Sequence, residues 1–123
     1  MTTPRVLLLE DDASLQTLLD TALTHAGYAV TTAIPNDYLF MAQEFKPHIV
    51  ILGSNDRELG DAGWTMAQLL NQTFPRLVVI LLSTHAAVID EVGVTPRGRC
   101  FDAGLRKPFK VDQLLHLIVC HYR

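Results

Sequence analysis

The chain has 123 residues, of which 49% are hydrophobic and 19% are charged. This length is typical of one domain, and the composition is too apolar for an intrinsically disordered tail. Ten Lys and Arg residues against thirteen Asp and Glu residues give a net charge of −3. Because nonspecific nucleic-acid-binding modules are usually basic, this charge disfavours such a role. We therefore predict a single domain over residues 1–123 that binds no nucleic acid.

The cysteines and the N-terminal region predict the cellular setting. Cys100 and Cys120 are too few for a disulfide framework, and neither has a metal-type spacing, so we expect both to be buried or half-buried thiols in a reducing compartment. The apolar run at residues 6–9 is too short for a signal peptide or for a membrane span, which needs about 20 apolar residues. We therefore predict a cytoplasmic protein that does not associate with membranes.

Short apolar runs alternate along the chain with segments of helical periodicity. Runs rich in Val and Ile are typical of strands buried on both faces, whereas apolar residues three and four apart indicate helices. The predicted strands lie at residues 6–9, 28–33, 49–52, 77–82 and 100–106. The predicted helices lie at residues 15–26, 35–45, 62–74, 86–94 and 111–122. Asp12 is a plausible N-cap and Gly27 a plausible stop for the first helix, whereas Gly93 and Pro96 make the fourth helix irregular.

This alternation of strands and helices predicts a doubly wound α/β fold, in which a parallel sheet is covered by helices on both faces. In such sheets ligands bind beyond the carboxyl ends of the strands. The residues that end each strand are therefore the first candidates for a functional site.

Polar residues follow three of the predicted strands. Glu10 and Asp11 end the first strand, and clustered carboxylates of this kind suit Mg²⁺. Ser83 follows the fourth strand and carries a hydroxyl that can hold an oxyanion. Lys107 follows the fifth strand, where it can neutralise the acids or contact a phosphoryl oxygen, and the bond to Pro108 is of the kind that can be cis. Each feature alone is also typical of an ordinary cap or turn.

Together these motifs resemble the receiver domain of two-component response regulators, over essentially the whole chain. The matching segments are Val-Leu-Leu-Leu-Glu-Asp-Asp, Lys-Pro-His-Ile-Val-Ile-Leu, Leu-Ser-Thr and Leu-Arg-Lys-Pro-Phe. The resemblance implies a five-stranded parallel sheet with five helices, and transfer of a phosphoryl group from a histidine kinase to an Asp after the third strand, assisted by Mg²⁺. It places Glu10 and Asp11 at the acidic-pair positions, Ser83 at the hydroxyl position and Lys107 at the phosphate-contacting lysine.

The sequence departs from this family at the phosphoacceptor. The acceptor Asp is expected six residues after Pro47, where this chain has Gly53, which has no side chain to phosphorylate. The aromatic residue expected three positions before Lys107 is replaced by Gly104, and the nearest aromatic residue is Phe101. We therefore predict a degenerate receiver in which Glu10 and Asp11 bind Mg²⁺ weakly or not at all, and Lys107 pairs with the acids directly. In an otherwise intact pocket, Gly53→Asp alone is expected to restore Mg²⁺ binding.

The leading functional hypothesis is a non-enzymatic interaction module in phosphorelay signalling that acts without phosphorylation. The resemblance implies that its partner, a histidine kinase, a separate output protein or a second copy of the chain, docks on the face formed by residues 86–94, 100–105 and 111–121. One alternative is a conventional receiver that uses the displaced Asp56. Another is a small α/β phosphatase or nucleotide-binding protein, although the Asp-x-Asp motif and the Gly-rich phosphate loop of those classes are missing.

Overall fold

The computed structural model describes residues 3–34, 36–54, 59–84 and 101–122, with the backbone alone described at 54 and 59–64. It contains the strands β1 (Arg5–Glu10), β2 (Ala29–Thr32), β3 (Ile49–Ser54), β4 (Val78–Ser83) and β5 (Ala103–Arg106). It also contains the helices α1 (Ala13–His25), α2 (Tyr38–Phe45), α3 (Leu59–Thr73) and α5 (Val111–His121). The expected fourth helix at residues 86–94 lies outside the described residues.

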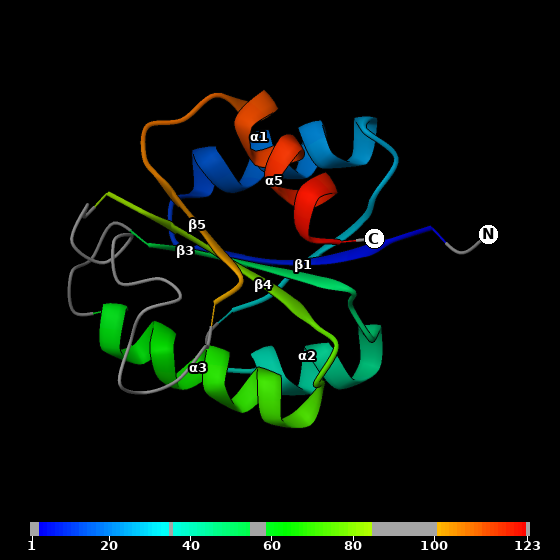
Figure 1. Ribbon diagram of the computed structural model, residues 1–123, viewed down its shortest axis with the longest axis vertical. Helices are drawn as coiled ribbons and strands as arrows, with labels where there is room; N and C mark the ends of the chain where they lie inside the picture. Colours follow the sequence, from blue (N-terminus) through cyan, green and yellow to red (C-terminus); the bar gives the residue numbers. More distant parts are fainter. Residues whose placement is uncertain (1–2, 35, 55–58, 85–100, 123) are drawn as a thin grey trace.

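The five strands form one parallel sheet in the order β2-β1-β3-β4-β5. Helices α1 and α5 cover one face of the sheet, and α2 and α3 cover the other (Figure 1). The predicted doubly wound α/β sandwich is therefore confirmed. Because all strands run in the same direction, their carboxyl ends meet along one edge of the sheet, and the C-terminal ends of the helices return to the opposite edge.

The core consists of two layers of apolar side chains, one on each face of the sheet. Successive residues of a strand point to opposite faces, so Leu8 and Ile51 pack with α1 and α5, whereas Leu7 and Val50 pack with α2 and α3. Both faces of β1, β3 and β4 are thus buried. This explains why these strands read in the sequence as continuous apolar runs rather than as alternating patterns.

Local signals at the ends of α1 act as predicted. The Asp12 side chain accepts hydrogen bonds from the backbone N–H groups of Ser14 and Leu15, at 3.0 and 3.2 Å. Gly27 follows the helix with a φ of 102°, a left-handed conformation that glycine adopts without steric cost. The chain then turns directly into β2.

Several boundaries differ from the sequence prediction, including those of β3, α2 and α3. β3 continues two residues past its apolar run, because Gly53 and Ser54 remain paired with Leu82 and Ser83 of β4. Helix α2 begins later than expected, at Tyr38, and α3 begins earlier, at Leu59. Helix ends are set by capping and tertiary contacts that apolar spacing does not encode.

Two other expectations concern burial. Cys120 lies exposed on α5, so the expectation that it is buried or half-buried is wrong, because the apolar stripe of α5 turns other residues toward the sheet. Cys100 lies outside the described residues. Among the helices of the described ranges, none has the length and apolar character needed to cross a membrane.

Candidate functional site at the carboxyl edge of the sheet

The sheet register brings the predicted site residues to one edge. Glu10, the last residue of β1, is the register partner of Gly53 on β3. Ser83 ends the neighbouring strand β4, and its carbonyl oxygen accepts a hydrogen bond of 2.8 Å from the backbone N–H of Lys107, directly after β5. The ends of β1, β4 and β5 thus lie at the same edge as the end of β3, where the resemblance predicts a phosphoacceptor.

A buried ion pair closes this edge. The Nζ atom of Lys107 donates to Oε1 of Glu10 at 2.8 Å, and the exposed fractions of the two side chains are 7% and 0%. The expected direct pairing of Lys107 with the acids is therefore confirmed, and the acid that it selects is Glu10. The Lys107–Pro108 peptide bond is cis, as the sequence allowed.

Gly53 is the residue that makes room for this pair. A Cβ atom built on Gly53 would overlap Oε2 of Glu10, and it would lie 2.7 Å from Cδ and 3.5 Å from Oε1 of the same side chain. The carboxylate of Glu10 therefore occupies the space into which a side chain at position 53 would point. Any side chain there requires the Glu10 carboxylate to move.

Burial dominates the electrostatics of Glu10. Desolvation raises the pKa of this carboxyl group above its ordinary value of 4.5, and the nearby Asp11 carboxyl raises it further. The Lys107 ammonium and the backbone N–H of Asp12, which donates to Oε1 at 3.1 Å, lower the pKa of Glu10 and offset part of this effect. The second oxygen, Oε2, is buried and accepts no hydrogen bond within the described ranges. Lys107 is therefore the principal counter-charge for Glu10.

The other predicted site residues lie around this pair. Ser83 is buried beside it, whereas Asp11 and Pro108 are exposed. Asp56 lies outside the described residues. Gly104 is paired with Leu81 inside the sheet, and Phe101 is buried in the core layer that packs against α2 and α3.

The donor set at this edge does not fit Mg²⁺. This ion requires nearly octahedral coordination by oxygen atoms. Oε1 of Glu10 contacts an ammonium group, and Gly53 supplies no side-chain oxygen. Over the described residues, no three His, Cys, Asp or Glu side chains gather closely enough to hold a metal ion. Asp11 is exposed, and the acid beside it, Glu10, is already engaged by Lys107.

Sequence reasoning missed that Glu10 fills the space next to Gly53. The sequence contained a signal for this. The first strand ends in Glu, which is one methylene longer than Asp, and the apolar run of the third strand is followed by Gly53, which has no side chain. Sequence spacing alone does not show that these two positions are register partners. The sheet register supplies that information.

No family model matches the chain, but comparisons with known proteins find related sequences and related structures. The chain is 31% identical over 119 residues to the DNA-binding transcriptional regulator NtrC of Klebsiella pneumoniae, covering 94% of this chain and 25% of the relative. It is 31% identical over 117 residues to the transcriptional regulatory protein PrrA of Mycobacterium bovis, covering 94% and 48%. The chain thus spans between a quarter and a half of the length of these relatives.

A solved structure has the same fold as this chain. The chemotaxis response regulator CheY4 of Vibrio cholerae superimposes with a TM-score of 0.76 at 22% identity, covering 97% of this chain and 98% of that one.

Proposed function

Since this chain is a receiver domain of the response-regulator class, we propose that it is a degenerate receiver in two-component signalling. It acts as a protein-binding module whose state does not depend on phosphorylation of an aspartate.

The observation that carries the proposal is the Glu10 carboxylate in the space beside Gly53. Phosphoryl transfer to a protein side chain requires a nucleophilic oxygen that the phosphoryl donor can approach in line. Position 53 has no such oxygen, and the adjacent space is filled. Glu10 is itself a poor acceptor, because its side chain is fully buried and one of its oxygens contacts Lys107.

The same arrangement supports weak or absent binding of Mg²⁺. A cation at this edge would have to compete with the Lys107 ammonium for Oε1 of Glu10, and an ammonium held at 2.8 Å repels a second positive charge. Asp11 would then be the main ligand. A single exposed carboxylate holds Mg²⁺ poorly, because this ion gives up its hydration water reluctantly.

For the protein partner we propose the side of the molecule formed by β5 and α5. Residues 86–94, which the sequence analysis also assigned to this surface, lie outside the described residues. β5 is an edge strand of the sheet, and α5 carries Val119 with 63% of its surface exposed. The unpaired backbone groups of an edge strand can pair with another chain, which makes this side of the molecule a candidate interaction surface. The partner is a histidine kinase, a separate output protein or a second copy of the chain.

Incubation with acetyl phosphate and Mg²⁺, followed by intact-mass measurement, tests the absence of phosphorylation. We expect no gain of a phosphoryl group in the wild-type protein. A phosphoryl group that is gained by the wild type and lost in Asp56→Ala would show that the displaced acid is the acceptor. A phosphoryl group that persists in Asp56→Ala would contradict the proposal for the whole domain.

A matched pair of variants provides the positive control for that experiment. Gly53→Asp alone must displace the Glu10 carboxylate, whereas Glu10→Asp combined with Gly53→Asp restores an acceptor and shortens the side chain that stands in its way. We expect the double variant to take up phosphate and to bind Mg²⁺ more tightly than the single variant. Equal behaviour of the two would show that Glu10 does not block position 53.

The partner surface is tested by Val119→Asp. A charge at an apolar contact is costly to bury, so we expect this variant to lose its partner. The measurement is a pull-down from native cells, in which mass spectrometry identifies the proteins bound by the wild type and by the variant. Sedimentation of the purified protein tests the second copy as a partner. Phe40→Asp is the matched control, because Phe40 on α2 is similarly exposed on the opposite face of the sheet. Equal loss in both variants would contradict a specific role for α5.

A further inference from the structure

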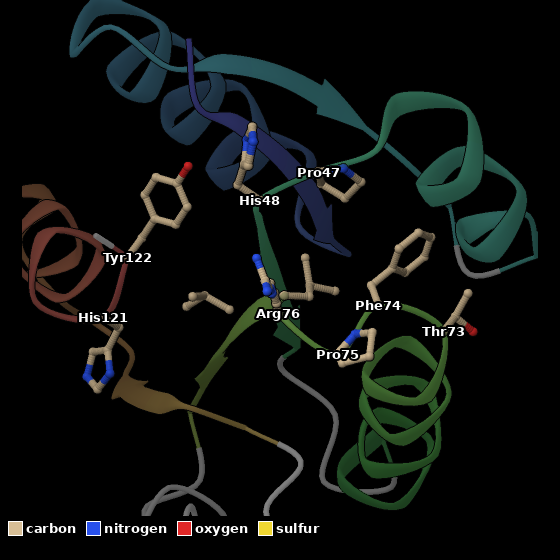
Figure 2. Close-up of a pocket in the computed structure, with 10 residues that line it drawn as sticks. Pro47, His48, Thr73, Phe74, Pro75, Arg76, His121 and Tyr122 are labelled. Atoms are coloured by element: carbon tan, nitrogen blue, oxygen red, sulfur yellow. The ribbon is translucent and has the colours of Figure 1, made fainter. Parts of the chain in front are cut away.

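A second concave region lies at the amino edge of the sheet, opposite the Glu10–Lys107 pair. It is an open cleft of about 650 Å³ between the end of α3, the start of β4 and the end of α5. We call it the amino-edge cleft. Figure 2 shows the Arg76 side chain lying between Phe74 and Pro75 on one side and Tyr122 on the other. Its volume falls in the range of small-molecule sites, which is roughly 300–1,000 Å³.

The cleft contains hydrogen-bond donors for which the described residues supply no partner. Within the described chain, neither the Arg76 guanidinium nor the Tyr122 hydroxyl makes a hydrogen bond or an ion pair. His48 uses Nδ1 to accept a hydrogen bond of 2.9 Å from the backbone N–H of Arg5. The proton of its neutral ring is therefore on Nε2, which is a further donor without a partner among the described residues.

The electrostatic character of the cleft is opposite to that of the whole chain. Among the described residues that line the cleft none is acidic, although the chain has thirteen acids and a net charge of −3. The cleft carries the permanent charge of Arg76. Burial and the neighbouring Arg5 lower the pKa of His48, which keeps its ring neutral at physiological pH, so His48 contributes a donor rather than a charge.

Arg76 is not needed to cap the helices that end nearby. The C-terminal carbonyl groups of helices carry partial negative charge and attract basic side chains. At α2 this role belongs to Arg5, whose Nε donates to the carbonyl oxygens of Phe45 and Lys46 at 2.9 and 2.8 Å. At α3 the Thr73 hydroxyl donates to the carbonyl oxygen of Leu69 at 2.9 Å. The guanidinium of Arg76 is thus left available for a ligand.

Apolar surfaces complete the cleft. Phe74, Pro75 and Pro47 lie along one side of it, and the rings of Tyr122 and His48, with centroids 5.4 Å apart, lie along the other (Figure 2). Flat rings on both sides of a cleft suit a flat or compact apolar ligand body. A guanidinium with free N–H groups between them suits a carboxylate or a phosphate.

We propose that the amino-edge cleft binds a small organic anion, in which one carboxylate or phosphate group is attached to an aromatic or aliphatic body. The anionic group contacts Arg76 and the Tyr122 hydroxyl, and the body packs against Phe74 and the neighbouring prolines. This site is independent of the proposed degenerate receiver function, because it lies at the other edge of the sheet and shares no residue with the Glu10–Lys107 pair.

Titration followed by ¹H–¹⁵N NMR tests the proposal with four probes. Phenyl phosphate and phenylacetate carry the required anion on an aromatic body, 2-phenylethanol is a neutral compound with the same body, and inorganic phosphate has no body. We expect the two aromatic anions to shift the amide signals of Val78 and Tyr122 with saturation, and to bind at least about tenfold more tightly than either control. Shifts without saturation, or equal affinity for 2-phenylethanol, would overturn the proposal.

Variants locate the binding. Arg76→Gln removes the charge of an exposed residue, and we expect it to lower the affinity for phenyl phosphate by about tenfold or more. Tyr122→Phe keeps the ring and removes the hydroxyl, so we expect a smaller loss. Arg106→Gln, which removes an exposed charge near the carboxyl edge, is the matched control and should leave the affinity unchanged. If Arg106→Gln weakens binding as much as Arg76→Gln, the effect is one of net charge, and the site is not the cleft.

Discussion

The polar groups at the two edges of the sheet differ in burial and in pairing. At the carboxyl edge, Glu10 and Lys107 are buried and bound to each other, and Gly53 leaves the space that the carboxylate fills. At the amino edge, Arg76 and the Tyr122 hydroxyl make no polar contact within the described chain and line an open cleft. The charged groups at the carboxyl edge are bound to each other, whereas the donors at the amino edge remain available to a ligand.

This difference separates residues that serve stability from residues that are available to a ligand. A charge that is buried and paired cannot be removed without leaving its partner in an apolar environment. A charge that is exposed and unpaired can be removed with little effect on folding. Substitutions at the two edges should therefore differ in their effect on the free energy of unfolding, and this difference can be measured.

The largest effect is expected for Lys107→Met. This change keeps most of the side-chain volume but leaves the Glu10 carboxylate buried without a counter-charge, so we expect a loss of about 3–5 kcal/mol in the free energy of unfolding. Urea unfolding at neutral pH measures it. Adding Glu10→Gln to Lys107→Met should recover most of the loss, because the uncompensated charge is then gone. Failure of the double variant to recover would mean that Lys107 acts mainly through packing.

A smaller effect is expected from the titration of Glu10. The pKa of this group is raised in the folded protein above its ordinary value of 4.5, so the folded state binds the proton more tightly than the unfolded state. The contribution of Glu10 to stability is therefore fully present below pH 4.5 and is lost as the pH rises through the raised pKa.

The measurement is urea unfolding of the wild type and of Glu10→Gln over a series of pH values at constant salt. The difference in unfolding free energy between them should change in favour of the wild type as the pH falls from neutral toward 4.5. A change in the opposite direction would show that the Lys107 ammonium outweighs burial and holds the pKa of Glu10 below its ordinary value.

The smallest effect is expected for Arg76→Gln. Arg76 is exposed and has no polar partner in the described ranges, so its removal should change the free energy of unfolding by no more than about 0.5 kcal/mol. The same urea unfolding experiment checks this. A loss comparable with that of Lys107→Met would mean that the amino edge is also a structural contact, and the contrast between the two edges would then fail.

Much of the fold could be predicted from the sequence, because the strands that define it are buried on both faces. The apolar runs at residues 6–9, 49–52 and 77–82 lie in the three central strands, and the spacing in the last helix places Leu114 and Ile118 in the core. The N-cap Asp12 was also readable, since a carboxylate just before an apolar helical stripe has few other local roles. Local and tertiary preferences agree at these positions.

The site could be predicted only in part. The strand-end positions of Glu10, Ser83 and Lys107 follow from the order of the motifs, and the direct pairing with Lys107 follows from the lack of an acceptor. The sequence does not show that Lys107 pairs with Glu10 rather than with Asp11. This preference depends on the register between β1 and β3 and on the reach of the longer side chain. No sequence motif predicts the amino-edge cleft, since His48, Arg76 and Tyr122 come from three separate segments.

The Glu10–Lys107 contact joins residues that are 97 positions apart in the chain. During synthesis, β1, β2 and β3 can pair long before Lys107 has left the ribosome, so Glu10 takes its place among the strands while its counter-charge is still missing. A polypeptide that stops before Lys107 therefore lacks the counter-charge of Glu10, whose carboxylate must then stay in water or become protonated to be buried. This single contact makes the burial of the β1 end depend on a residue that is synthesised 97 positions later.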